Sequence, residues 1–142
     1  MSSKQQNIDI IKAWLDAHNR DDIEGELAFW DDHAEMTIVP TGKTYNGIDE
    51  LRDAAQMAVK SQGRKTLSHI FADDEWVCAE YTAVAKVAGP MEAHNISIPA
   101  GVTKEITLQI CFLANIREGK ITRSREYWDT GSMMRQLSGQ QQ

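Results

Sequence analysis

The first half of the chain carries hydrophobic residues at the three- and four-residue spacing of amphipathic helices. Ile11, Leu15 and His18 lie on one such stripe. The same spacing recurs after Asp22 and after Asn46, two residue types that commonly precede a helix. Three helices are therefore predicted, over residues 7–20, 23–30 and 48–62, with a short alternating strand over 35–39 before a Pro-Thr-Gly turn.

Beyond Gly63 the hydrophobic period changes to the two-residue period of strands. Strands are predicted over 66–71, 75–87, 105–116 and 121–128, followed by a short helix capped by Asp129. The longest connection, 88–103, carries apolar side chains and is expected to lie over another part of the fold. Helices first and strands later predict a single α+β domain over 1–139, with the helices on the concave face of a curved antiparallel sheet. The Gln-rich tail, 140–142, is predicted to be disordered.

Strand alternation predicts which side chains face the helices. In the strand over 105–116 the set that contains Ile110 and Phe112 is apolar throughout, so this set is assigned to the helix side. In the preceding strand the small residues Ala79, Ala83 and Ala85 would leave space unfilled, which predicts a pocket for a small apolar ligand or substrate. The other face of the sheet is also partly apolar, which predicts a homodimer through that face.

Charge and composition exclude several classes of function. The chain has 15 Lys and Arg against 21 Asp and Glu, a net charge of −6, so nucleic-acid binding is not expected. No apolar run is long enough to span a bilayer and no signal-peptide stretch is visible, so we expect a cytoplasmic protein without membrane association. Cys78 and Cys111 lie in apolar runs and are expected to be reduced. The four histidines lack paired ligand spacing, so neither a metal nor a cofactor is predicted.

The C-terminal part of the chain carries a recognisable motif. The run Gly119-Lys-Ile-Thr-Arg-Ser-Arg-Glu-Tyr-Trp-Asp, followed by Met134-Arg-Gln-Leu, resembles the C-terminal signature of SnoaL-like proteins in the nuclear transport factor 2-like superfamily. Segment 19–24 and the Pro40-Thr-Gly turn resemble two loops of the same superfamily. The resemblance implies a cone-shaped α+β barrel, usually a homodimer, with a pocket between sheet and helices.

The resemblance singles out one acidic residue. SnoaL-like polyketide cyclases carry an acid/base aspartate five positions after the isoleucine of the Gly-Lys-Ile motif, and that position is Glu126 here. Limonene epoxide hydrolases also have an acidic residue at this place. The sequence departs from the cyclases at Phe112 and Ile110, where they have histidine and glutamine, so those polar partners are absent.

Two other branches of the superfamily fit less well. The epoxide hydrolases' arginine and second aspartate correspond to Tyr81 and Ala83, so their charge relay is missing. Ketosteroid isomerases have their general base where Val39 stands, and their oxyanion-hole phenol falls near Trp14, whose indole N–H donates a hydrogen bond but is no acid. Both mechanisms are therefore disfavoured.

Glu126 is the predicted general acid/base. Ile110, Phe112 and Trp128 are expected around it, and such apolar surroundings favour the protonated form of a carboxyl group near neutral pH. The alternative is a surface ion pair of Glu126 with Arg123 or Arg125.

Other aromatic and histidine side chains complete the predicted site. His69 and Tyr81 are candidates to hydrogen-bond a developing enolate oxygen, with simple packing as the alternative for each. The predicted substrate-binding wall consists of Trp14, Trp30, Ile110, Phe112 and Trp128.

These features predict a small cofactor-independent isomerase or cyclase. It would transfer a proton on an apolar, carbonyl-bearing metabolite of polyketide or steroid type. Two alternatives stay open. One is a non-catalytic ligand-binding or dimerisation module of the same fold, and the other is an epoxide hydrolase or dehydratase with rearranged residues.

Overall fold

The computed structural model describes residues 3–93 and 96–139. The tail predicted to be disordered, 140–142, lies outside the described residues. Ser3 caps the first helix in a reciprocal capping box with Gln6, and Asp22 and Asp129 cap the second and the last helix. The helices are α1 (Lys4–Asn19), α2 (Ile23–Leu27), α3 (Gly47–Lys60) and α4 (Thr130–Ser138). No helix within these ranges is both long and apolar enough to cross a membrane.

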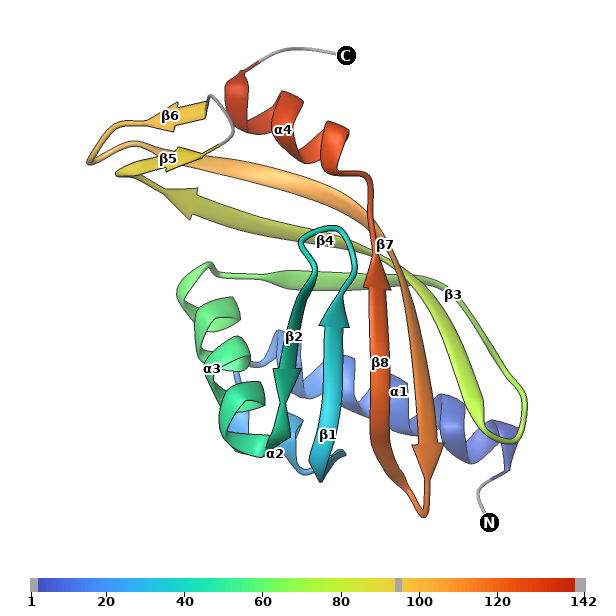
Figure 1. The fold of residues 1–142 in the computed structure, drawn as a ribbon. Helices are drawn as coiled ribbons and strands as arrows, with labels where there is room; N and C mark the ends of the chain where they lie inside the picture. Colours follow the sequence, from blue (N-terminus) through green and yellow to red (C-terminus); the bar gives the residue numbers. More distant parts are fainter. Residues whose placement is uncertain (1–2, 94–95, 140–142) are drawn as a thin grey trace.

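Six strands form one curved sheet in the order β2-β1-β8-β7-β4-β3 (Figure 1). They are β1 (Trp30–Ile38), β2 (Lys43–Asn46), β3 (Arg64–Ala72), β4 (Trp76–Ala88), β7 (Thr103–Arg117) and β8 (Lys120–Tyr127). The short strands β5 (Met91–Ala93) and β6 (Ile96–Ile98) pair separately, beside α4. The sheet stays open because β2 and β3 are edge strands.

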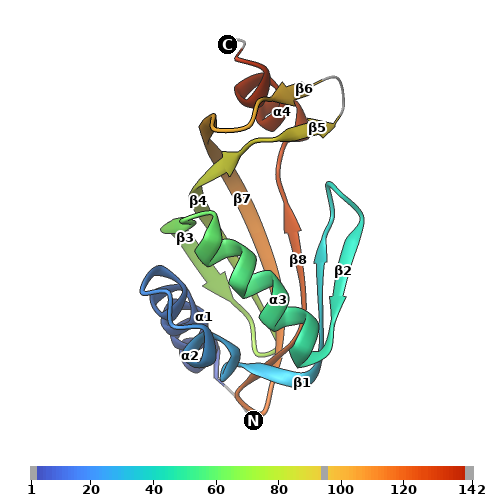
Figure 2. The same cartoon turned by 90° about the vertical axis from the view of Figure 1, so that its left-hand side faces the viewer.

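The predicted α+β architecture is confirmed. Figure 2 shows α1, α2 and α3 on the same side of the curved sheet, where α1 contacts β3 and β4 and α3 contacts β1. The inner set of β7 is buried as the alternation predicted, from Leu108 through Ile110 and Phe112 to Ile116. Trp14 of α1 stacks on Phe112 with ring centroids 4.7 Å apart, which fixes the helix on the sheet.

Two local predictions were wrong. The second helix ends at Leu27, and Trp30 begins β1 instead, because its backbone pairs with Ile121 of β8. This β1–β8 pairing is parallel, so the sheet is not purely antiparallel. In both cases pairing with a distant segment overrides the local sequence pattern. The expectation that the 88–103 connection lies over another part of the fold is confirmed, because Ile98 of its β5–β6 pair is buried in the core.

Strand β3 contains a bulge. Leu67 pairs with Tyr81 and His69 pairs with Glu80, so Ser68 is one extra residue on β3. Because successive side chains of a strand point to opposite faces, an extra residue reverses the alternation after it. Before the bulge Lys65 and Leu67 face inward, and after it Ile70 is the half-buried residue.

Candidate functional site

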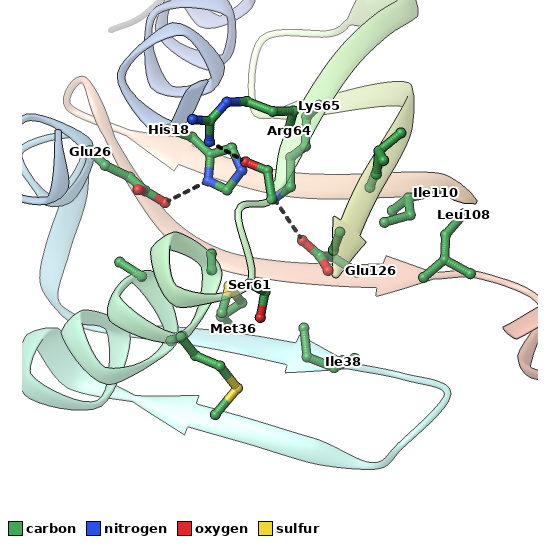
Figure 3. A pocket seen from close by; sticks show the side chains of 18 of the residues that line it. His18, Glu26, Met36, Ile38, Ser61, Arg64, Lys65, Leu108, Ile110 and Glu126 are labelled. Atoms are coloured by element: carbon green, nitrogen blue, oxygen red, sulfur yellow. Dashed lines mark hydrogen bonds and ion pairs between the residues drawn. The ribbon is translucent and has the colours of Figure 1, made fainter. Parts of the chain in front are cut away.

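A cavity of about 370 Å³ lies between the helices and the inner face of the sheet. Its wall is mainly apolar and includes the predicted residues Trp14, Trp30, Ile110 and Trp128. Ionisable side chains interrupt this wall at several places, among them His18, Glu26, Lys65 and Glu126 (Figure 3). The cavity is thus a hydrophobic pocket with a few polar groups, the usual composition of a small-molecule site.

Glu126 lies in the wall of this pocket. It is carried by β8, between Ile38 of β1 and Phe112 of β7, and is only 7% exposed. The Tyr81 hydroxyl donates a hydrogen bond of 2.9 Å to Glu126 Oε1, and Lys65 Nζ lies 3.8 Å from the same oxygen. Glu126 therefore does not form the alternative surface pair, and Arg125 instead lies 5.7 Å over the ring of Trp76.

Lys65 is a pocket residue that the sequence analysis missed. Its ammonium group lies 4.9 Å from the ring centroid of Trp14 and 5.0 Å from that of Tyr81. Two aromatic faces and a carboxylate surround this charge, and each of them stabilises a cation. The available signal was its inward alternation with Leu67 on β3.

Tyr81 supports Glu126 from behind the pocket. It is on the inner face, as predicted, but it is fully buried and is not among the residues that line the cavity. Burial raises the pKa of Tyr81 well above its ordinary value of 10.0, and the neighbouring Glu126 carboxylate raises it further. The phenol is therefore a neutral donor that positions the carboxylate. Phe112 is likewise fully buried and packs behind Trp14 instead of lining the cavity.

The prediction that His69 faces the concave side is wrong. The bulge at Ser68 turns His69 outward, where its side chain is 78% exposed and pairs with Glu80 at 3.2 Å. His69 is not among the residues lining the cavity, so the structure does not bring it to Glu126.

A second pair of ionisable side chains, His18 with Glu26, lines the pocket and was also missed. His18 Nδ1 of α1 lies 3.6 Å from Glu26 Oε1 of α2, and both residues are buried. Figure 3 shows this pair on the side of the pocket formed by α1 and α2, apart from Glu126. The available signal was that His18 is a polar residue at an apolar helical spacing, where it was grouped with Ile11 and Leu15.

The site residues do not form a metal centre. Within residues 3–93 and 96–139, no group of three or more His, Cys, Asp or Glu side chains could hold a metal ion. Cys78 and Cys111 are both free thiols, as predicted.

Comparison with known proteins places this geometry in a family. The family model of the SnoaL-like domain matches residues 11–124. The chain belongs to the SnoaL-like family. No curated protein matches the sequence.

Solved structures share the fold of this SnoaL-like protein. A proposed polyketide cyclase from Xanthomonas campestris pv. campestris is 23% identical, with a TM-score of 0.78 over 96% of this chain and 100% of that one. An LEH-like epoxide hydrolase from M. tuberculosis is 19% identical, with a TM-score of 0.76 over 94% of this chain and 90% of that one. A nuclear transport factor 2-like protein from Burkholderia xenovorans is 23% identical, with a TM-score of 0.72 over 96% and 99%. At these identities the similarity shows the fold alone.

Proposed function

We propose that this SnoaL-like protein is a cofactor-independent isomerase or cyclase that transfers a proton on an apolar, carbonyl-bearing molecule of polyketide or steroid type. One observation carries the proposal: Glu126 lies in the wall of an apolar pocket with the Lys65 ammonium 3.8 Å away. A carboxylate is a suitable base for the proton next to a carbonyl, and a cation stabilises the enolate that results.

The pairing of Glu126 with Lys65 explains how the reaction would proceed without a change of charge in the pocket. The carboxylate takes the proton as the substrate C–H bond breaks, and the electron pair moves to the carbonyl oxygen. Glu126 becomes neutral at that moment, so Lys65 exchanges one anionic partner for another. The negative charge moves from protein to substrate beside the same cation, which limits the cost of creating an enolate in an apolar cavity.

Tyr81 would act as a positioning residue in this scheme. Its hydrogen bond and the Lys65 contact both involve Oε1 of Glu126. Oε2 is then the oxygen that accepts the substrate proton. A fixed carboxylate orientation matters because proton transfer needs the donor and acceptor atoms within hydrogen-bond reach.

Solvent exchange of an enolisable ketone tests the proposal. The probe is α-tetralone, incubated with the protein in D₂O, and the loss of its α-proton signal is followed by NMR. We expect the wild type to accelerate exchange over buffer and Glu126→Gln to lose about a hundredfold of that acceleration, since general acid–base catalysis contributes about 10²–10⁴-fold. The matched control is Glu80→Gln, which removes an exposed carboxylate on the other face of the sheet.

The same experiment separates the enzyme from the non-catalytic module. The apolar residues Ile110 and Phe112, at positions that are polar in the cyclases, favour the module. Binding of α-tetralone, measured by the fluorescence of the pocket tryptophans, without accelerated exchange in the wild type would contradict catalysis and support a ligand-binding module.

We also propose that two copies associate through the outer face of the sheet in a cytoplasmic homodimer. Phe71 pairs with Cys78, Cys111 pairs with Tyr127, and the two sulfur atoms lie 3.7 Å apart, so these residues form a continuous diagonal band across four strands. Phe71 and Tyr127 are both exposed large hydrophobic residues. Light scattering should give a dimer mass for the wild type and a monomer for Phe71→Glu, and an unchanged mass would exclude this face.

A further inference from the structure

His18 is held by two elements so that, within the part of the chain that the structure describes, one of its ring nitrogens has a partner and the other has none. It lies in the last turn of α1, and its Nδ1 faces the Glu26 carboxylate of α2 at 3.6 Å. The residue is 5% exposed and belongs to the pocket wall. A carboxylate beside one ring nitrogen fixes the orientation of the imidazole and directs the other nitrogen away from it.

The other nitrogen, Nε2, is buried without a hydrogen-bond partner among the described residues. Buried polar atoms are nearly always paired, so an unpaired one indicates a missing partner. Gly63, another residue of the pocket wall, lies next to Nε2 and has no side chain: a Cβ on Gly63 would lie 3.8 Å from this nitrogen.

We propose that His18 is a specificity-determining residue that binds a hydroxyl group of the ligand through Nε2. This inference rests on the proposed function, because the same ligand would present its carbonyl group to Glu126 and Lys65. The proposed substrates are therefore carbonyl compounds that also carry an alcohol or phenol hydroxyl group. An apolar part of the molecule separates the hydroxyl group from the carbonyl group.

A hydroxyl group fits this position in either charge state of the histidine. In the neutral ring with its proton on Nδ1, beside Glu26, Nε2 accepts a hydrogen bond, whereas in the charged ring Nε2 donates one. A hydroxyl group both donates and accepts. A carbonyl or ether oxygen would bind only the charged ring.

Matched probes test the proposal. Binding of α-tetralone is compared with binding of its phenolic isomers, which add one ring hydroxyl, by tryptophan fluorescence and calorimetry. We expect the wild type to bind at least one phenolic isomer about three- to tenfold more tightly than the parent ketone, the usual gain from one hydrogen bond. His18→Phe should reduce this affinity ratio to about one.

Gly63→Ala is the second variant, and it separates recognition from a purely structural role of the pair. The added methyl group would lie in ordinary contact with the Ala58 carbonyl oxygen, at 3.4 Å, and would cover Nε2 without altering His18 or Glu26. We expect it to reduce the affinity ratio as well. If His18 only ties α1 to α2, the ratio will survive Gly63→Ala, and the proposal is wrong.

The outcomes also separate this inference from the proposed function. Accelerated α-proton exchange with no preference for any phenolic isomer overturns the inference alone. A preference that depends on His18 without any exchange supports the inference and contradicts catalysis. If the wild type binds none of the probes, both are overturned.

Discussion

Two pairs of a basic and an acidic side chain extend from β3 on opposite faces of the sheet, and they differ in burial and in separation. The inner pair, Lys65 with Glu126, has side chains only 15% and 9% exposed at a separation of 3.8 Å. The outer pair, His69 with Glu80, is closer at 3.2 Å, but its side chains are 78% and 56% exposed. Water screens an exposed pair, whereas the buried charges of Lys65 and Glu126 interact more strongly with each other. Burial, more than distance, decides which pair matters to stability and chemistry.

The largest expected effect comes from removing the inner cation. Lys65→Met leaves the buried Glu126 carboxylate without its charge partner, and we expect a loss of about 2–3 kcal/mol in the free energy of unfolding, measured with urea. The double variant Lys65→Met/Glu126→Gln should recover most of this loss, because no unpaired charge remains. A loss below about 0.5 kcal/mol would show that the inner pair behaves like a surface pair.

Removing the Tyr81 hydroxyl tests the second partner of Glu126. Tyr81→Phe deletes the donor at 2.9 Å from Oε1 and keeps the ring. We expect a loss of about 1.5–2 kcal/mol, in the lower part of the range for a hydrogen bond to a charged group. In the exchange assay this variant should lower the rate without abolishing it, since Glu126 and Lys65 remain. Full retention of both stability and rate would contradict the positioning role.

Alkaline pH is expected to have a smaller effect on the free energy of unfolding, through the titration of Tyr81. The raised pKa of Tyr81 means that the folded protein keeps the phenol proton above pH 10 while the unfolded chain releases it, so stability falls as pH rises. Between pH 10 and 11 the wild type should lose about 1 kcal/mol more than Tyr81→Phe. Cys78, whose pKa is raised to about 11 by burial, contributes equally to both proteins and cancels in this difference.

The smallest effect is expected on the outer face. Glu80→Gln removes the exposed partner of His69, and the free energy of unfolding should change by less than about 0.5 kcal/mol, at low salt as well as at high salt. A change as large as that of Lys65→Met would overturn the contrast between the two faces.

The sequence was sufficient to predict the fold and the place of Glu126. Two-residue alternation in β7 assigned Ile110 to the helix side, and the motif around Gly119 placed the acidic residue on the last strand. Both features are local, because they depend only on the spacing of residues within one strand. The burial of Glu126 follows from that placement.

The environment of Glu126 was not predictable in the same way. The bulge at Ser68 arises from the pairing of β3 with β4, and a strand considered alone does not reveal an extra residue. It is the reason why His69 was placed on the wrong face. Lys65 is held by rings from α1 and β4, and the partner of His18 comes from a separate helix. Contacts between distant elements set these positions.

The place of β8 in the sheet has a consequence for any ligand. This strand has β7 on one side and β1 on the other, and the backbone carbonyl of Glu126 itself accepts a hydrogen bond from the Val39 N–H. The main chain that carries this carboxylate is therefore held by pairing on both sides. A ligand of another shape must therefore be accommodated by its own conformation or by changes in the helices. We expect new specificities in this fold to arise from substitutions on the helix side of the pocket, with the position of Glu126 unchanged.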